Sequence, residues 1–436
     1  MSFIWFQHYP TGVNHEINPD IFPSIKDFAV DCFKKYADLD AYVNLGKSLT
    51  YAQIDALSSQ FAAFLQNDLG IKKGDRIAIQ MPNLLQYPVV MFGALKAGAI
   101  VVNTNPLYTP KEMKHQFNDA GVKAVIILAN FASQLQQILP ETNIEHIVVT
   151  QIGDMLGGLK GAIVNFVVKS IKKMVPAYSL PTAISFNTAM KKGANSTYNE
   201  VDIAGDDVAF LQYTGGTTGV AKGAMLTNRN IMANMMQIAE WKKPLLRERE
   251  ETIITALPLY HIFALTVNCL SMLKIGAKNI LVTNPRDMPA FIKDLKKYPF
   301  TVITGVNTLF NGLLNQEAFR AIDFSKLKIS VGGGMAVQKS TAEEWKQVTG
   351  SDLVEGYGLT ESSPVLSCNA VDGTLRLGTI GIPLPSSELT IRDDDGNEVA
   401  TGQPGEIWGR GPQIMKGYWE RPEATAEVLT DDGWLK

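Results

Sequence analysis

The sequence lacks paired cysteines, long apolar runs and an excess of charge. Its 436 residues contain three cysteines, Cys32, Cys269 and Cys368, and five histidines, all widely spaced, which argues against a disulfide framework and a zinc cluster. No run approaches the roughly 18 apolar residues of a membrane-spanning helix, and residues 1–8 lack the basic and apolar regions of a secretory signal. The formal net charge of −3 indicates no basic surface for nucleic acid. We therefore expect a cytoplasmic protein that is soluble or peripheral on the inner face of the cell membrane.

The composition, 46% hydrophobic and 19% charged, is that of an ordinary globular protein, and apolar strands alternate with helices. An amphipathic helix is predicted over residues 50–69, because Thr50 and Gln53 have the spacing of a capping box and apolar residues recur every three to four positions. Another helix is predicted over residues 84–97. The expected strands are residues 76–81, 99–102, 123–128, 146–150, 207–212, 252–257, 279–283, 301–304 and 328–331. Strands that are apolar throughout and separated by helices predict parallel sheets covered on both faces.

The order of these elements predicts an α/β fold with two similar parallel-sheet subdomains and a small β-rich subdomain. The expected ranges are residues 1–200, residues 201–378 and residues 379–436. In the last range, residues 388–392 and 405–409 read as short antiparallel strands, with Asp395-Gly396 as the hairpin signal.

Residues 156–175 mix apolar side chains with Lys160, Lys169, Lys172 and Lys173. Such a segment suits a membrane interface, with its lysines near anionic headgroups. It equally suits an amphipathic helix packed on its own protein. The sequence leaves both interpretations open.

The densest chemical signal is a glycine- and threonine-rich loop between the strand at residues 207–212 and a helix expected after Leu226, with Thr227 or Asn228 as its N-cap. Glycines let backbone N–H groups turn toward one point, and threonine hydroxyls and a lysine complete a site for a polyphosphate. The spacing differs from a Walker A loop, because two residues separate Gly219 from Lys222. The residues assigned to nucleotide binding here are Tyr213, Thr214, Gly215, Gly216, Thr217, Thr218, Gly219, Val220, Ala221, Lys222, Gly223 and Ala224.

Two further motifs are assigned to the nucleotide. The run Gly332, Gly333 and Gly334 ends a strand and leaves a backbone wall without side chains. In the second motif Tyr357 lies between glycines, where a purine can stack on its ring. Thr360 can donate to the α-phosphate, and Glu361 is a hard oxygen ligand for Mg²⁺, together with Thr217. The assigned residues of this motif are Glu355, Gly356, Tyr357, Gly358, Leu359 and Thr360.

These motifs resemble, in order along nearly the whole chain, those of the adenylate-forming enzymes: acyl-CoA synthetases, firefly luciferase and peptide-synthetase adenylation domains. The segments that carry the resemblance are residues 213–224, 257–263, 330–335, 355–361, 405–411 and 416–422. The resemblance implies that ATP activates a carboxylic acid as its acyl-adenylate, in an in-line displacement where positioning and charge neutralisation dominate. It implies catalytic roles for Thr214, Lys222, His261 and Glu361, and an acyl site at His261, Phe263, Gly333 and Gly358.

The class of acid follows partly from the residues. Amino-acid-activating relatives hold the substrate ammonium with an aspartate near the position of residues 260–263, but residues 257–273 contain no acidic side chain. An unpaired buried ammonium would be costly, which disfavours an amino acid. The apolar residues 262–267 and 269–273 suit either a hydrocarbon channel or core, and so leave the chain length open.

Closer resemblance, at residues 18–20, 160–175 and 331–337, is to bacterial long-chain fatty-acid–CoA ligases, which are soluble yet membrane-associated. This implies fatty acid, ATP and CoA as substrates and Mg²⁺ as cofactor, with a homodimer as an open expectation. The alternatives are a fatty-acyl-AMP ligase, a medium-chain or aryl acyl-CoA synthetase, and a non-enzymatic nucleotide-binding regulator.

The resemblance also concerns the end of the chain, at Gly433-Trp-Leu-Lys436. Family members continue through a hinge into a C-terminal lid domain that supplies a catalytic lysine. Lys436 is not that lysine. We therefore expect this chain to hold the ATP and fatty-acid site but to be largely inactive in full turnover.

Overall fold

The computed structural model describes residues 3–214 and 220–436, and its contacts divide the chain into two compact units. Unit 1 comprises residues 3–22, Ala224–Leu257 and Ile262–Lys436; unit 2 comprises Pro23–Gly223 and Pro258–His261. The predicted boundary after residue 200 lies inside unit 2, and the one after residue 378 lies inside unit 1. This division therefore differs from the three expected ranges, which stay a prediction. Within the described ranges, no helix has the length and apolarity needed to cross a membrane.

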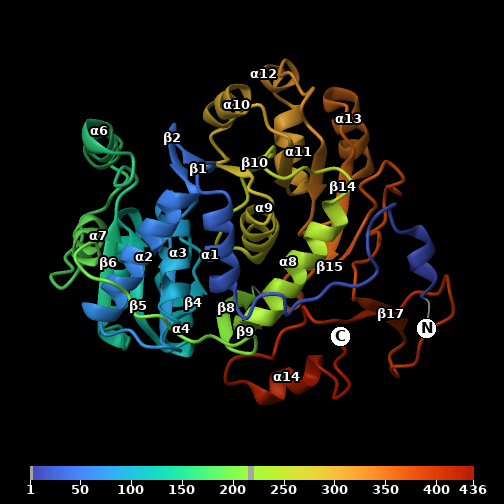
Figure 1. Ribbon diagram of the computed structural model, residues 1–436, viewed down its shortest axis with the longest axis horizontal. Helices are drawn as coiled ribbons and strands as arrows, with labels where there is room; N and C mark the ends of the chain where they lie inside the picture. The colour runs from blue at the N-terminus through green and yellow to red at the C-terminus, as the bar shows by residue number, and fades with distance from the viewer. Residues whose placement is uncertain (1–2, 215–219) are drawn as a thin grey trace. The chain divides into compact units, whose positions relative to one another are not determined.

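Unit 2 contains a parallel sheet whose strand order is β7-β6-β5-β3-β4-β8, with β9 next to β8 (Figure 1). The strands are β3 (Arg76–Gln80), β4 (Ile100–Asn103), β5 (Val122–Leu128), β6 (His146–Thr150), β7 (Ile184–Ser185), β8 (Val208–Thr214) and β9 (Lys222–Thr227). The division between the units falls inside β9. Nearly every residue of β3 to β6 is buried, as expected for parallel strands covered on both faces.

The helices of unit 2 follow the predicted periodicity. The capping box of α2 is confirmed, because Oγ1 of Thr50 accepts from the backbone N–H of Gln53 while Oε1 of Gln53 accepts from that of Thr50. The elements are α1 (Ile25–Lys35), a hairpin of β1 (Asp40–Asn44) and β2 (Lys47–Thr50), α2 (Tyr51–Asn67), α3 (Gln86–Lys96), α4 (Pro110–Asp119), η2 (Ala129–Phe131), α5 (Ala132–Ile138), η3 (Leu139–Glu141), α6 (Gly158–Phe166), η4 (Val167–Ile171) and α7 (Phe186–Gly193). Every residue of α3 is buried, so this helix is covered on all sides by other parts of the protein.

Unit 1 contains a second sheet, in the order β16-β15-β14-β13-β12-β10-β11. Its strands are β10 (Thr252–Thr255), β11 (Lys278–Leu281), β12 (Val302–Gly305), β13 (Ile329–Gly332), β14 (Leu353–Gly358), β15 (Val365–Cys368) and β16 (Ile382–Pro383). The strands from β11 to β14 are parallel, and β15 and β16 add an antiparallel edge. The core between this sheet and its helices includes Trp241, Val302 and Leu384.

The helices of unit 1 are η1 (Ile4–His8), α8 (Asn228–Lys242), η5 (Ala264–Leu270), α9 (Ser271–Leu273), α10 (Met288–Lys297), α11 (Asn307–Leu314), α12 (Glu317–Arg320), α13 (Lys339–Thr349), η6 (Thr360–Ser362) and α14 (Pro422–Val428). Residues 264–273 are buried, so this part of the apolar segment considered for a hydrocarbon channel forms core. The length of the acyl chain is not indicated by it.

Two local predictions need correction. Residues 222–227 form strand β9, where only a loop leading to a helix was expected; α8 begins at Asn228, with Thr227 as its N-cap. The Asp395-Gly396 turn does not join the two predicted strands directly. It leads from Arg392 to a bridge with Glu398, and β17 (Glu388–Arg392) pairs antiparallel with β18 (Glu406–Arg410) only after that. The predicted α/β class, with parallel sheets and a small antiparallel sheet, is confirmed.

Candidate active site

The glycine- and threonine-rich loop lies between β8 and β9, the position predicted for it. Tyr213, near the end of β8, is buried, and its phenol donates a 2.7 Å hydrogen bond to Oδ2 of Asp119 at the end of α4. A Cβ at position 223 would lie 3.0 Å from the Tyr213 ring, so glycine is needed there to let β9 pass. These contacts fix the point at which the chain enters and leaves the loop.

The two predicted catalytic residues of this loop lie together. Oγ1 of Thr214 is 3.5 Å from the carbonyl oxygen of Lys222, which begins β9. The preceding carbonyl, that of Ala221, is 2.9 Å from Nε2 of His115, while Val220 is exposed. The structure therefore brings the Thr214 hydroxyl to the backbone of Lys222, at the two ends of the loop. The binding of phosphate oxygens by these two side chains stays a prediction.

Five of the predicted nucleotide-binding residues, Gly215, Gly216, Thr217, Thr218 and Gly219, lie outside the described residues. Their assignment, including that of Thr217 to the metal, stays a prediction.

The segment around His261 is held in unit 2 by a buried polar network. Nε2 of Gln212 donates to the carbonyl oxygen of Tyr260 at 2.7 Å, and the Tyr87 phenol donates to that of Leu259 at 2.8 Å. Asn103 connects these two side chains: its Oδ1 accepts from Tyr87 at 2.7 Å, and its Nδ2 donates to Oε1 of Gln212 at 3.1 Å. Because Gln212 directly precedes Tyr213, the network ties residues 258–261 to the strand that carries the phosphate loop.

His261 keeps more than a third of its surface open to solvent. The protein atoms that surround its imidazole nevertheless lower its pKa below the usual value, because desolvation disfavours the charged form. At neutral pH the ring is therefore neutral, with one nitrogen as donor and the other as acceptor.

In unit 1 the structure brings together two of the predicted acyl-site residues. A Cβ on Gly333 would lie 2.9 Å from the ring of Phe263, so the half-buried aromatic packs directly on the glycine backbone. Gly334 has a φ of +77°, a conformation that favours glycine. Gly332 is equally crowded, since its Cβ would meet Val337 at 2.5 Å. Close contacts at Gly332 and Gly333, and the backbone conformation at Gly334, favour glycine at all three positions.

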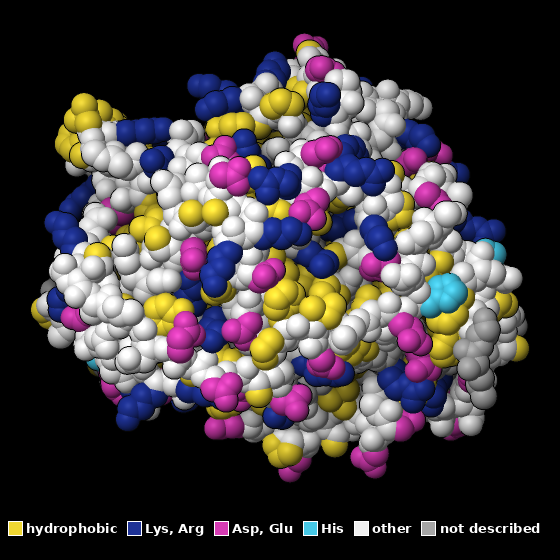
Figure 2. Space-filling model, in the orientation of Figure 1, with side chains coloured by type: hydrophobic (Ala, Val, Ile, Leu, Met, Phe, Trp, Pro, Cys, Tyr) yellow, Lys and Arg dark blue, Asp and Glu magenta, His cyan; other side chains and the backbone are white. Residues whose placement is uncertain are grey.

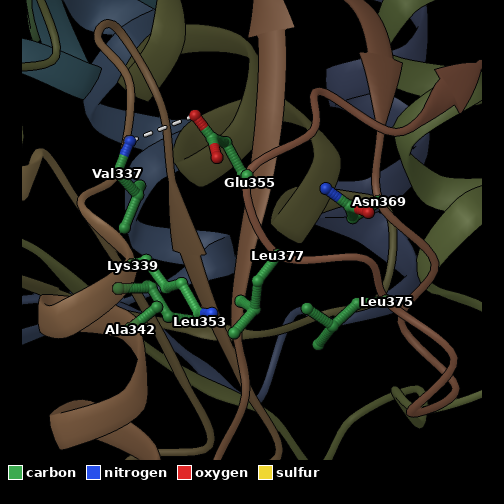
Figure 3. A pocket seen from close by; sticks show the side chains of 9 residues that line it. Val337, Lys339, Ala342, Leu353, Glu355, Asn369, Leu375 and Leu377 are labelled. Atoms are coloured by element: carbon green, nitrogen blue, oxygen red, sulfur yellow. Dashed lines mark hydrogen bonds between the residues drawn. The ribbon is translucent and has the colours of Figure 1, made fainter.

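The strand that follows, β14, carries the second motif. Oε1 of Glu355 accepts a 3.1 Å hydrogen bond from the backbone N–H of Val337, which closes the loop that begins with the three glycines (Figure 3). Glu355 also lines a pocket beside β14. The other lining residues are Val337, Lys339, Ala342, Leu353, Asn369, Leu375, Leu377 and Gly378. Glu355 is the one member of the predicted nucleotide set among them.

Tyr357 is half-buried on β14, where it pairs with Ser367 of β15. Burial, followed by the charge of Glu406, raises the pKa of its phenol above the usual value. At Gly358 a Cβ would overlap the carbonyl oxygen of Pro364, so this position tolerates glycine alone. The same carbonyl accepts a 3.0 Å hydrogen bond from the N–H of Leu359, which directs the chain into η6.

Thr360 and Glu361 begin η6, and Glu361 is fixed by two contacts. Its Oε1 accepts a 2.6 Å hydrogen bond from the Tyr418 phenol, and its carbonyl accepts from the N–H of Met415 at 2.7 Å. The segment around Tyr418 is in turn bonded to β9 through Met225, whose N–H donates to the carbonyl of Gly417 at 2.8 Å. Ala224, also on β9, is fully buried and forms an isolated antiparallel β-bridge with Tyr418.

The residues fit a Mg²⁺ ion that is bound partly by the protein and partly by the phosphates of the substrate. Glu361 offers a carboxylate, and Mg²⁺ is usually held by one or two carboxylates together with phosphate oxygens and waters. Among the described residues there is no group of three or more His, Cys, Asp or Glu side chains that could hold a metal. A dedicated all-protein cage is not needed for this mode of binding.

Sequence reasoning missed the residues that hold the site, chiefly Asp119, Tyr87, Asn103 and Tyr418. Tyr418 lies in a segment that contributed to the family resemblance, and its motif could have indicated a role. The others have no local signal, because each bonds a partner far along the chain.

Known proteins resemble this chain over most of its length. The profile of the family described as AMP-binding enzyme matches residues 30–419. A long-chain-fatty-acid–CoA ligase of Yersinia pestis is 53% identical over 435 residues, which cover 100% of this chain and 77% of that protein. Among solved structures, an anthranilate CoA ligase in complex with anthranoyl-AMP superposes with a TM-score of 0.83 at 22% identity, covering 96% of this chain and 76% of the other. A long-chain-fatty-acid–CoA ligase from Archaeoglobus fulgidus gives a TM-score of 0.80 at 23% identity, covering 98% and 83%. At such identities the structural likeness establishes the fold.

Proposed function

This chain belongs to the AMP-binding enzyme family, and we propose that it is a long-chain fatty-acid–CoA ligase that forms acyl-CoA by way of an acyl-adenylate. The observation that carries the proposal is the 53% identity over the whole chain to a relative of that name. The phosphate loop between β8 and β9 and the glycine-lined β13–β14 region support the ATP-dependent half of the reaction.

In the first step a carboxylate oxygen of the fatty acid attacks the α-phosphorus of ATP. A new P–O bond forms as the P–O bond to diphosphate breaks, and diphosphate leaves. We assign Thr214 and Lys222 to the phosphate oxygens, whose charge they would neutralise, and Tyr357 to stacking on the adenine. Mg²⁺, held by Glu361 and the phosphates, would offset charge on the leaving group.

In the second step the CoA thiol loses its proton to solvent and its sulfur attacks the acyl carbonyl carbon. A C–S bond forms, and the C–O bond to AMP breaks. We assign His261 to the acyl carboxylate and the entry of the pantetheine arm. A neutral His261 can hydrogen-bond the acyl group without adding a charge, in keeping with its lowered pKa. Phe263 and Gly333, which contact each other, and Gly358 would line the acyl group.

Two further parts of the proposal concern the assembly and its location. We infer peripheral contact with the inner face of the cell membrane, supported by the exposed apolar and basic segment at α6. A homodimer stays a prediction, for which light scattering of the purified chain is the direct test.

The experiment that tests the function is ATP–diphosphate exchange with a panel of acids. Palmitate should support the fastest exchange, with octanoate, benzoate and glycine much slower. A preference for octanoate or benzoate would replace the proposal with a medium-chain or aryl synthetase. Nucleotide binding without affinity for any acyl-adenylate analogue, a measurement that does not depend on turnover, would favour the regulator.

The acceptor of the acyl group is tested separately. The adenylate is detected by trapping with hydroxylamine, and its transfer to CoA is compared with its transfer to acyl-carrier protein. Transfer to CoA supports the ligase, whereas transfer to the carrier protein alone would identify a fatty-acyl-AMP ligase. Because exchange needs no acceptor, a failure of the second half-reaction leaves the first measurable.

A further inference from the structure

Residues 157–178, here called the docking segment, expose an unusual amount of apolar surface. They comprise α6, the π-helical turn η4 and the turn that follows. The large apolar side chains that stand open to solvent, with their exposed fractions, are Leu159 (78%), Ile163 (51%), Phe166 (60%), Ile171 (64%), Met174 (51%) and Tyr178 (37%). Single exposed apolar side chains are common on soluble proteins, but a contiguous group marks a surface that binds something.

These side chains gather in one place. Leu159, Ile163 and Phe166 recur at intervals of four and three, which places them along one side of α6. The next turn is π-helical: the N–H of Lys172 bonds the carbonyl of Val167, five residues earlier. A turn of this width puts Ile171, rather than Ser170, in line with Phe166. Figure 2 shows the resulting apolar cluster where α6 lies in Figure 1, with basic side chains beside it.

The charged side chains of the docking segment itself all have one sign. From residue 155 to residue 199 the chain contains no Asp or Glu, but it contains six lysines. Four of them, Lys160, Lys169, Lys172 and Lys173, belong to the docking segment, and all four are exposed. A second copy of this chain would bring a surface of the same sign and be repelled, whereas an anionic surface would be attracted.

The docking segment is held to unit 2 by polar contacts, not by burial of its apolar face. Oδ1 of Asn165 accepts from the N–H of Gly153 at 2.7 Å, and its Nδ2 donates to Asp154 at 3.1 Å. At the far end, Nδ2 of Asn130 donates to the carbonyl oxygen of Met174 at 3.0 Å. Gly161, the buried residue of α6, meets the backbone of Gly153 where a side chain would not fit. The segment is thus fixed in place while its apolar side chains remain uncovered.

We propose that the docking segment binds the surface of a bilayer that contains anionic phospholipid. Leu159, Ile163 and Phe166 enter the boundary between headgroups and acyl chains, while Lys169, Lys172 and Lys173 lie against headgroup phosphates. The proposal deepens the peripheral membrane contact of the proposed function and rests on it. It would place the enzyme where a long-chain fatty acid, which partitions into bilayers, is concentrated.

The test is flotation with vesicles of phosphatidylcholine mixed with phosphatidylglycerol, compared with vesicles of phosphatidylcholine alone, without ATP or fatty acid. The unsubstituted chain should float with the anionic vesicles and much less with the neutral ones. Replacing Leu159, Ile163 and Phe166 together by serine should lower the affinity about tenfold or more, since three apolar side chains no longer enter the lipid. Replacing Lys169, Lys172 and Lys173 together by glutamine should lower it about tenfold or more, and should reduce its dependence on salt.

Matched controls come from the same unit. Leu107, which is 60% exposed, is replaced by serine, and the exposed Lys34, Lys111 and Lys191 are replaced together by glutamine. Both controls should float like the unsubstituted chain. If the serine triple variant fails to fold, the glutamine triple variant, which alters exposed charges alone, decides the question.

The proposal is overturned if the unsubstituted chain does not float with anionic vesicles, or if both triple variants float as well as their controls. A dimer that the serine variant abolishes, in the absence of flotation, would instead assign the surface to self-association. ATP–diphosphate exchange with detergent-dispersed palmitate is measured on the same samples and should not change. Loss of exchange from every sample would count against the proposed function while the flotation result still decided the docking segment.

Discussion

The phenol of Tyr418 donates a 2.6 Å hydrogen bond to Oε1 of Glu361, across 57 residues of chain. Tyr418 is buried, and burial, followed by this hydrogen bond, raises the pKa of its phenol well above the usual value. The phenol therefore stays a donor at any working pH. It orients the carboxylate assigned to Mg²⁺, much as outer partners orient the ligands of other metal sites.

Tyr418→Phe removes this donor while keeping the ring. We expect kcat/KM for Mg²⁺-ATP to fall about tenfold or more, as is usual when an outer partner of a metal ligand is lost, with more Mg²⁺ needed for half-maximal exchange. Glu361→Gln should produce the same change more strongly, because it removes the charge itself. Tyr178→Phe, at an exposed tyrosine, is the control. Unchanged Mg²⁺ dependence in both site variants would remove Glu361 from the metal site.

Tyr87→Phe tests the buried network that holds residues 258–261. The substitution removes the single phenolic hydrogen that Oδ1 of Asn103 and the carbonyl of Leu259 share. Leaving buried acceptors unsatisfied costs about 1–3 kcal/mol of unfolding free energy. Urea unfolding followed by circular dichroism measures the change, and Tyr178→Phe should be neutral. A neutral result at Tyr87 would mean that water or a local shift satisfies these acceptors.

Gly358→Ala should be among the most damaging single-methyl changes in the chain. The added Cβ would overlap the carbonyl oxygen of Pro364, a backbone atom that cannot rotate away. We expect a loss of more than about 2 kcal/mol in unfolding free energy, or no folded protein. Gly373→Ala is the matched control: its φ is +91°, but no atom lies within 4 Å of the added Cβ, so strain of about 1 kcal/mol is its main cost. Equal effects of the two changes would contradict the steric explanation.

The buried Lys242 should make the unfolding free energy depend on pH in a predictable way. Burial lowers the pKa of its ammonium group to about 7, against the opposing effect of the Glu251 carboxylate. Between about pH 7 and its usual pKa near 10, the unfolded chain binds a proton there that the folded chain does not. The unfolding free energy should therefore rise with pH in this window, by up to about 1.4 kcal/mol per pH unit. Below pH 7 both states bind the proton, so the slope due to Lys242 should vanish there.

Lys242→Met keeps the aliphatic stem and removes the amine. The variant should gain stability at pH 7 relative to the unsubstituted chain and lose most of the slope between pH 7 and 9. Urea unfolding across that range measures both effects. Lys243→Met, at the exposed neighbouring residue, should leave the slope as it was.

Sequence alone predicted the elements whose signals are local. The capping box at Thr50 and the apolar runs of β3 to β6 are examples, since periodicity and caps act within a few residues. Strand β9 was missed because its first residues, Lys222 and Gly223, read as the end of a loop. Residues 222–227 form a strand because they pair with another strand, and such pairing cannot be read from a few neighbouring residues.

The same distinction applies to the site. Short motifs indicated Lys222, Tyr357 and Glu361 directly, because their spacing reflects a local backbone shape. The residues that hold the site together could not be found in this way. For example, Oδ1 of Asn83 accepts a hydrogen bond from the N–H of Leu259, 176 residues away. Such pairs are set by the packing of the whole sheet.

The chain's first residues belong to unit 1, whose other parts begin at Ala224. The Tyr9 phenol donates to the carbonyl of Pro383, 374 residues later, and the N–H of Ile17 donates to Ser386. At roughly 5–20 residues per second, a ribosome needs on the order of 20 to 75 seconds to supply that partner. During this time the aromatic side chains of the first residues can pack only on one another: Phe3 stacks on Trp5, and Phe6 meets both rings edge-on. The opening segment therefore waits for almost the whole chain to be synthesised before its own contacts in unit 1 can form.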